Sequence, residues 1–341
     1  MTPVIVAIPA RNEVDRIGAC LAALAAQPGA QRHIAGVTVF ANNCSDDTVV
    51  AVRAAATPFP VHLVEAHLRT GHAHVGHARR GAANAALAFA AGRGIANPII
   101  AGTDADSCVT SDWLAALLAA FAGSADAVCG DIDLETPVPI GIAAARASET
   151  AYAYAVACAA ALLDPLAHDP WPNHQWCWGA NLAVRARVLT AVGGSPLVDL
   201  AEDRALHATL IAADVCVRHS RAVRVITSAR TAGRAPGGFA DALATYDRSP
   251  AALADFWLEP AALAWRRARA RGAARRQWGR APGFGAAWAS REASDPALAP
   301  QRVALADLAA ETARLAGWIS AAGRRSDSWG AAFAPPAAQR A

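Results

Sequence analysis

The chain has 341 residues, and 54% of them are hydrophobic, which excludes an intrinsically disordered protein. It has no Lys, so its 31 positive residues are all Arg, and the net charge is only +3. Seven scattered Cys without a CxxC pair exclude a small disulfide scaffold and favour reduced thiols in a cytoplasmic protein. The N-terminus lacks a basic start, and the uncharged run 150–163 is too short to span a bilayer, so no signal peptide or membrane span is expected.

Short apolar runs alternate with helical patterns over the first part of the chain. The strands predicted there are 4–8, 36–41, 61–65, 98–102 and 127–131. The helices predicted between them are 15–26, 48–56, 76–91 and 111–122. This alternation predicts an α/β fold with an open, mostly parallel sheet and helices on both faces.

The alternation stops after about residue 135. Helices are predicted there over 142–163, 181–191 and 203–213, and strands over 215–218 and 223–227. From residue 239 onward the pattern is helical, with breaks at four prolines. We therefore expect an α/β domain at 1–238 and a helical C-terminal extension at 239–341.

Polar segments follow three of the predicted strands: Arg11–Glu13, Asn42–Asp47 and Asp104–Asp106. Ligands of open parallel sheets bind beyond the carboxyl ends of the strands, so these segments are expected to line one crevice. Asp104 and Asp106 place two carboxylates at a strand end, which suits a hard cation such as Mg²⁺ that also binds phosphate oxygens. The alternative is a polar strand end in which one Asp caps the next helix.

Six motifs in this order resemble the family-2 glycosyltransferases of the GT-A fold, over roughly residues 1–235. The motifs are Ile8–Glu13, Asn42–Thr48, Gly76–Arg79, Asp104–Asp106, Trp178–Arg185 and Glu202–Asp203. The resemblance implies inverting transfer of a sugar from a nucleotide-diphosphate sugar donor to a hydroxyl acceptor, with Mg²⁺ or Mn²⁺. It also implies a catalytic domain at 1–238 with a nucleotide-binding half (1–110) and an acceptor half (111–238). The QxxRW motif of the family's processive members is missing, so single addition is expected.

The resemblance also implies roles for individual residues. Asp203 is the expected catalytic base and Glu202 its support, although two acids also suit the start of an ordinary helix. Asn42 and Asn43 stand where the family more often has Asp, which leaves the nucleobase open. The full set implied for donor binding is Pro9, Arg11, Glu13, Asn42, Asn43, Arg79, Asp104, Ala105, Asp106, Gly179 and Asn181.

Three further expectations come from the second half of the domain. Arg230 and Arg234 lie in a Gly/Arg loop that could close over a diphosphate, because guanidinium groups suit phosphate oxygens. Trp176 and Trp178 are candidates for acceptor binding, with core packing as the alternative. His219 is the candidate third metal ligand beside Asp104 and Asp106, and the segment around Thr227 competes with it for that position.

The extension holds six of the ten Trp, so we expect it to pack on its own catalytic domain or on a second copy in a homodimer. Residues 261–280 hold seven Arg and no acid, and this run is expected on the exposed face. Contact with an anionic membrane surface is the alternative role for it, and no nucleic-acid partner is expected. The competing enzyme classes are a sugar nucleotidylyltransferase on a related fold and a haloacid-dehalogenase-like phosphatase.

Overall fold

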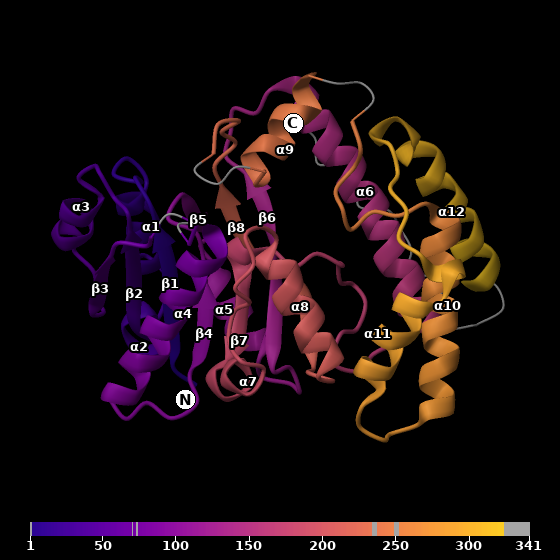
Figure 1. The fold of residues 1–341 in the computed structure, drawn as a ribbon, viewed down its shortest axis with the longest axis horizontal. Helices are drawn as coiled ribbons and strands as arrows, with labels where there is room; N and C mark the ends of the chain where they lie inside the picture. Colours follow the sequence, from indigo (N-terminus) through magenta and orange to yellow (C-terminus); the bar gives the residue numbers. More distant parts are fainter. Residues whose placement is uncertain (1, 70, 73, 234–236, 249–251, 324–341) are drawn as a thin grey trace.

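The computed structural model describes residues 2–69, 71–72, 74–233, 237–248 and 252–323 (Figure 1). Its centre is an eight-stranded sheet of order β3-β2-β1-β4-β7-β6-β8-β5. The strands are β1 (Val4–Ala10), β2 (Ile34–Asn42), β3 (Val61–Ala66), β4 (Ile99–Gly102), β5 (Ser107–Val109), β6 (Ala127–Leu134), β7 (Leu182–Arg185) and β8 (Val217–Thr227). Among the described residues, no helix is both long enough and apolar enough to cross a bilayer.

The first four strands form a parallel half, as predicted, and β7 runs antiparallel to β4 and β6. The sheet is therefore mixed. The helix predicted over 181–191 is wrong in its first half, since a 3-10 turn (η1, Gly179–Asn181) and β7 precede α7 (Ala186–Ala191). Three of the four residues of β7 (LAVR) favour helix, and the hydrogen bonds of β7 to β4 and β6 override that preference. Strand β5 was not predicted, and the two strands expected over 215–227 form one strand, β8.

Helices cover both faces of the sheet, so the predicted α/β class is confirmed. One face is covered by α1 (Ile17–Ala25), α3 (Thr48–Ala54) and α5 (Trp113–Ala120). The other is covered by α4 (Val75–Gly92), α7 and α8 (Glu202–Ala212). Helix α1 shows the cause, because its buried Ile17, Leu21 and Leu24 recur at helical spacing on one stripe. The short α2 (Ala30–His33) precedes β2.

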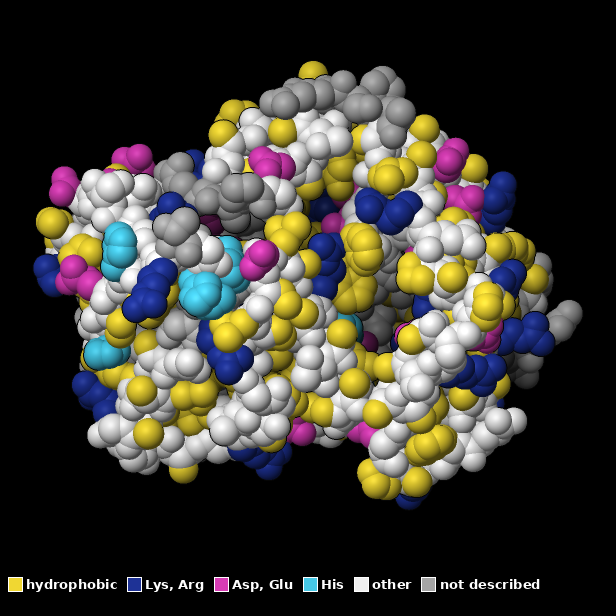
Figure 2. Space-filling model, in the orientation of Figure 1, with side chains coloured by type: hydrophobic (Ala, Val, Ile, Leu, Met, Phe, Trp, Pro, Cys, Tyr) yellow, Lys and Arg dark blue, Asp and Glu magenta, His cyan; other side chains and the backbone are white. Residues whose placement is uncertain are grey.

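A bundle of helices flanks the sheet (Figure 1). It consists of α6 (Ile140–Leu163), α9 (Phe239–Arg248), α10 (Ala261–Trp278), α11 (Phe284–Ser294) and α12 (Leu308–Gly323), with short turns η2 (Pro296–Leu298) and η3 (Leu305–Asp307). Helices α10 and α12 pack on α6, and α11 packs on α8, so the extension docks on its own chain. Gly272 permits the contact with α6, because a Cβ there would lie 2.1 Å from the Leu163 carbonyl oxygen. Figure 2 shows the surface hollowed between the sheet and the bundle.

The arginines of α10 are not all on an exposed face, which corrects the prediction for residues 266–280. Arg271 and Arg275 both bond to Asp164 at the end of α6, each at 2.7 Å. Arg267 bonds to Glu259 and Glu292 at 2.8 and 2.7 Å. The expectation assumed that the guanidinium groups are unpaired and therefore costly to bury. In the structure, acids outside the run pair with three of its seven arginines.

Candidate active site

The loops that follow β1 and β2 are bonded to each other at the carboxyl edge of the sheet. The backbone N–H of Glu13 donates to Thr48 Oγ1 at 2.8 Å, and that of Ser45 donates to Asn12 Oδ1 at 2.8 Å. Asn12 adopts a left-handed backbone with φ of 54°, which Asn tolerates better than most residues. Two of the three predicted polar segments therefore form one rim, with Arg11 exposed on it.

The third segment joins this rim through Arg230. Its guanidinium bonds to both carboxylate oxygens of Glu13, at 2.8 and 3.0 Å, and to Asp106 Oδ2 at 2.9 Å. Burial, followed by the negative charge of Asp104, raises the pKa of Asp106 to about 6. The loop after β8 thus reaches the Asp104–Asp106 segment through Arg230, whose predicted contact with a diphosphate stays a prediction. Arg234 lies outside the described residues.

Arg79 links this segment to the acidic pair at the start of α8. It lies in the second turn of α4, and its three guanidinium nitrogens take different partners. Nη2 donates to Asp104 at 2.9 Å, Nε to Glu202 at 2.7 Å and Nη1 to the Gly179 carbonyl at 2.6 Å. Burial alone would lower the Arg79 pKa, but the charges of Asp104 and Glu202 outweigh burial and raise it. The Arg79 side chain therefore lies between the two acidic motifs and bonds to one acid of each.

Asp203 is fixed by two backbone donors. The N–H of Gly179 donates to its Oδ2 at 2.9 Å, and the N–H of Arg204 donates to its Oδ1 at 2.7 Å. Burial, together with the charge of Glu202, raises the pKa of Asp203 above its ordinary value. Ala201, just before the helix, is left-handed with φ of 59°, a conformation that costs a non-glycine residue about 1–2 kcal/mol. The backbone thus accepts some strain where the acidic pair begins.

Several residues predicted to bind the donor are buried or are hydrogen-bonded to other parts of the protein. Asn181 is 3% exposed and fills an irregularity between β6 and β8: Nδ2 donates to the carbonyls of Asp131 and Val223, and Oδ1 accepts from Trp113 Nε1. Asn43 makes two bonds to the backbone of Leu68, at 2.9 and 3.1 Å. The remaining residues of this kind are Pro9 within β1, buried Asn42 beside Asn43, and buried Ala105.

The predicted aromatic pair lies between the sheet and the bundle. Trp176 is 2% exposed and packs in the core that α6 shares with α10 and α12. Trp178 is half-buried, with its ring centroid 5.6 Å from that of Trp176 and 5.8 Å from that of Phe239. Arg146 of α6 lies over both indoles. Core packing, the alternative given above, thus describes Trp176, and of the two only Trp178 keeps surface for an acceptor.

His219 is not brought to Asp104 and Asp106. It sits on β8 directly opposite Cys129 of β6, which pairs with Leu182 of β7, which in turn pairs with Gly102 of β4. Three strand spacings therefore separate the backbones of His219 and Gly102, or about 14 Å. His219 instead contacts Asp169 and His207. Neither of these residues was predicted as a site residue, because their spacing from His219 in the sequence matches no ligand motif.

Comparisons with known proteins give one family match and several similar solved structures. Residues 5–151 match the model of glycosyl transferase family 2, and no curated protein matches the chain. Similar solved structures include residues 1–349 of S. aureus TarS in complex with UDP (14% identity, 82% of this chain and 73% of that chain, TM-score 0.49). Another is the mannosyltransferase PcManGT from Pyrobaculum calidifontis in complex with GDP-Man and Mn²⁺ (21% identity, 96% and 81%, TM-score 0.48). A third is glucosyl-3-phosphoglycerate synthase from Mycobacterium tuberculosis in complex with Mn²⁺ and UDP-glucose (16% identity, 72% and 76%, TM-score 0.44).

Likenesses at these identities and TM-scores say nothing about what this chain binds. The family match is independent of them, and it spans β1 to the middle of α6, including the Asp104–Asp106 segment. Residues 5–151, somewhat less than half of the chain, are therefore a glycosyl transferase family 2 domain, in agreement with the family that the sequence motifs resemble.

Proposed function

We propose that the chain is an inverting, metal-dependent glycosyltransferase that moves one sugar at a time from a nucleotide-diphosphate sugar to a hydroxyl acceptor. The observation that carries this proposal is that Arg79 joins Glu202 to Asp104, whose side chain is 33% exposed and keeps one carboxylate oxygen outside this contact. The contact brings together two acidic motifs that are about a hundred residues apart in sequence, and we propose that one serves the donor and the other the acceptor.

The carboxylates of Asp104 and Asp106 fit a divalent cation. Arg79 contacts Oδ1 of Asp104, so its Oδ2 is left for a cation. Arg230 contacts Oδ2 of Asp106, and its Oδ1 accepts a long 3.5 Å bond from Ser107 Oγ, so this oxygen can also face a cation. Two such oxygens, completed by water and diphosphate oxygens, are the ligands that Mg²⁺ or Mn²⁺ prefers. The chemistry supplied by the ion there is neutralisation of charge on the nucleotide-diphosphate leaving group. Arg79 and Arg230 keep the acids in position by balancing their charge.

Asp203 is proposed as the base that serves the acceptor. It takes the proton of the acceptor hydroxyl while that oxygen attacks the anomeric carbon and the bond to the diphosphate breaks. Attack from the face opposite the leaving group inverts the anomeric configuration. The raised pKa of Asp203 suits this role, since a base is most effective when its pKa lies near the working pH. The bonds from Gly179 and Arg204 hold the carboxylate in one orientation.

The test of the donor site is calorimetry of the full chain with UDP and with GDP, each with and without Mn²⁺. We expect one of the two to bind only with the metal. Asp106→Asn should weaken that binding at least about 10- to 100-fold, because it removes a ligand of the cation. Asp133→Asn is the matched control, since Asp133 pairs with Arg224 in an exposed position on β6. Unchanged binding by the Asp106 variant would contradict the assignment.

The test of the reaction is transfer from a panel of nucleotide sugars carrying the nucleobase that binds. Proton NMR of the product reports the configuration at the anomeric carbon. A product with the opposite configuration to the donor supports an inverting transferase. Retention of the donor's configuration would contradict the proposed role of Asp203. Formation of a nucleotide sugar from a sugar 1-phosphate and a nucleoside triphosphate, with release of diphosphate, would indicate a nucleotidylyltransferase instead.

A further inference from the structure

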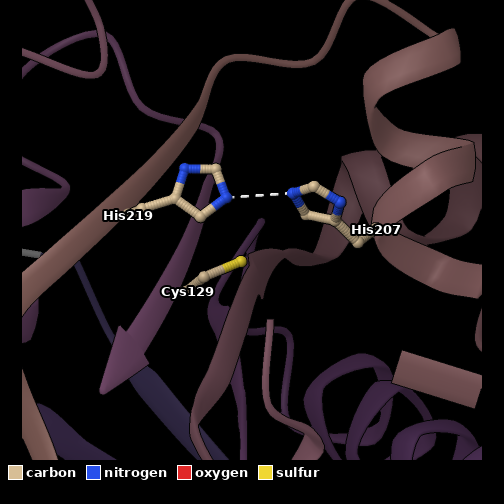
Figure 3. Close-up of side chains that lie close together, drawn as sticks. All are labelled: Cys129, His207 and His219. Atoms are coloured by element: carbon tan, nitrogen blue, oxygen red, sulfur yellow. Dashed lines mark hydrogen bonds between the residues drawn. The ribbon is translucent and has the colours of Figure 1, made fainter. Parts of the chain in front are cut away.

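A second group of potential ligands lies away from the crevice, where β6, β8 and α8 meet. His207 Nε2 and His219 Nε2 face each other at 2.9 Å, and Figure 3 shows the Cys129 sulfur to one side of the line between them. All three ligand atoms lie within 4.8 Å of one another. Cys129 and His219 are buried, and they are paired residues of neighbouring strands. Three separate elements therefore aim a soft or borderline donor at one point.

The ring of His219 is held in the orientation that a metal ligand needs. Its Nδ1 bonds to Asp169 Oδ2 at 2.9 Å, which leaves Nε2 facing His207 and Cys129. Asp169 is itself held by Arg218 Nη1 and by the backbone N–H of His219, both at 2.9 Å. A carboxylate that bonds to the outer nitrogen of a ligating His is the usual support of zinc-bound imidazoles.

We propose that Cys129, His207 and His219 bind a zinc ion that fastens helix α8 to the sheet. A thiolate with two imidazoles is a zinc-type ligand set, and hard cations such as Mg²⁺ disfavour it. Bond lengths of about 2.0–2.3 Å in a tetrahedral site separate the ligand atoms by about 3.3–3.6 Å. The two Nε2 atoms are 2.9 Å apart, and no two of the three ligand atoms are more than 4.8 Å apart. Side-chain shifts of only about 1 Å would therefore give the tetrahedral spacing. Within the described part of the chain, these residues are the only group of three or more His, Cys, Asp or Glu close enough to hold an ion.

This site is distinct from the cation site proposed at Asp104 and Asp106. The two differ in ligand chemistry, and the backbones of Gly102 and His219 are three strands apart in one row of the sheet. The zinc proposal therefore does not depend on the proposed glycosyl transfer. Helix α8 carries residues of both regions, because His207 lies four residues after Asp203 and hence on the same side of that helix.

The experiment uses the full chain, stripped with a chelator and titrated with Co²⁺ as a spectroscopic substitute for Zn²⁺. Bound Co²⁺ absorbs in the near ultraviolet through charge transfer from a thiolate. We expect one equivalent to bind with that band and Zn²⁺ to displace it. We also expect zinc to raise the thermal unfolding midpoint. If the wild-type chain shows no thiolate band, or if zinc does not displace Co²⁺, the proposal is wrong.

Variants locate the ion. Cys129→Ala should abolish the band, whereas Cys158→Ala, which removes an equally buried thiol from α6, should keep it. His207→Gln should weaken binding at least tenfold, and His174→Gln, beside His219 but outside the group, should leave the affinity unchanged. Asp169→Asn should cost about 10- to 100-fold in affinity through loss of the support to His219.

Some of these variants remove buried groups, so circular dichroism must first show a wild-type fold. If Cys129→Ala does not fold, the decision rests on His207→Gln, because His207 sits on the outer helix layer. The double variant Asp104→Asn/Asp106→Asn must retain the thiolate band. Persistence of the band in Cys129→Ala, or its loss in the Asp104/Asp106 double variant, would overturn the placement of the ion.

Discussion

The crevice and the helical bundle are built with the same kind of contact. In the crevice, Arg79 joins Asp104, Glu202 and the Gly179 carbonyl. In the bundle, Arg267 joins Glu259, Glu292 and the Leu298 carbonyl in the same three-way pattern. A buried guanidinium that bridges two distant acids is therefore a way of fastening elements together, and by itself it does not identify an active site.

The two regions differ in how completely their acids are used. Asp164 in the bundle is 2% exposed, and Arg271 and Arg275 between them bond to both of its oxygens. Asp104 in the crevice is 33% exposed, and Arg79 bonds to one of its oxygens. An acid whose two oxygens are both paired with arginines is neutralised within the fold, whereas an acid at the edge of the sheet that keeps an oxygen free of any arginine is suited to a ligand. The predictions below test this distinction.

The largest effect is expected from removing the central cation of each region. Arg79→Gln leaves Glu202 buried without its partner and should cost about 3–5 kcal/mol in the free energy of unfolding. Arg267→Gln unpairs the partly buried Glu259, which water can solvate in part, and should cost less. Urea denaturation measures that cost. Only the Arg79 variant should also lose metal-dependent nucleotide binding, because only Arg79 touches Asp104. Equal loss of binding in both variants would contradict the division of roles.

The next effect separates chemistry from binding within the crevice. Asp203→Asn removes the proposed base and should lower kcat by about 10²–10⁴, with donor affinity nearly unchanged. Single-turnover kinetics and calorimetry on the same preparation measure the two quantities. A collapse of donor affinity would instead assign Asp203 to the nucleotide site.

The pH dependence of the reaction gives an independent check on Asp203. A protonated carboxyl cannot accept the acceptor proton, so kcat falls as the pH falls through the pKa of this group. Because burial and Glu202 raise that pKa, the acid limb of the profile should lie above the range of an ordinary exposed Asp. Asp203→Asn should abolish the limb. A limb that survives in the variant would belong to another group.

Much of the parallel half of the fold could be predicted from the sequence, because the signals there are local. Apolar runs that end in polar residues indicate strands, and Asp104 and Asp106 follow one directly. Strand β7 was missed, since Leu, Ala and Arg of LAVR favour helix over strand and the segment becomes a strand only between β4 and β6. Local pattern therefore identified the crevice edge better than the middle of the sheet.

The contacts that organise the site join residues far apart in sequence. The sequence therefore predicted several of these residues but not which of them contact each other. Arg79 meets Glu202 across 123 residues, and Arg230 meets Glu13 across 217. The placement of Cys129 opposite His219 depends on strand register, which no spacing in the chain expresses. Asn181 belongs to a motif of the resemblance, yet the structure places it at the β6–β8 irregularity, and only the sheet geometry shows this.

A smaller effect is expected at the acid that the bundle saturates. Asp164→Asn removes one charge from a site where Arg271 and Arg275 are each about one-third exposed. Water can solvate the released guanidinium groups in part, so the cost should be about 1–3 kcal/mol in the free energy of unfolding. Turnover measured below the unfolding transition should match the wild type. A specific loss of kcat would connect α6 to the chemistry more closely than its contacts indicate.

The smallest effect is expected where the cation is exposed. Arg314 bonds to buried Glu311 at 2.6 Å within α12, but its own side chain is 60% exposed. Glu311 also accepts a 2.6 Å bond from the backbone N–H of Ala261, and this bond survives when Arg314 is changed. Arg314→Gln should therefore cost no more than about 0.5 kcal/mol, as for other exposed pairs on one helix. Glu311→Gln should cost more, because the N–H of Ala261 at the start of α10 then loses a charged acceptor in a buried position. Urea denaturation of both variants compares them. If Arg314→Gln lowered the free energy of unfolding more than Glu311→Gln did, the exposure of an arginine would not predict how much its ion pair stabilises the protein.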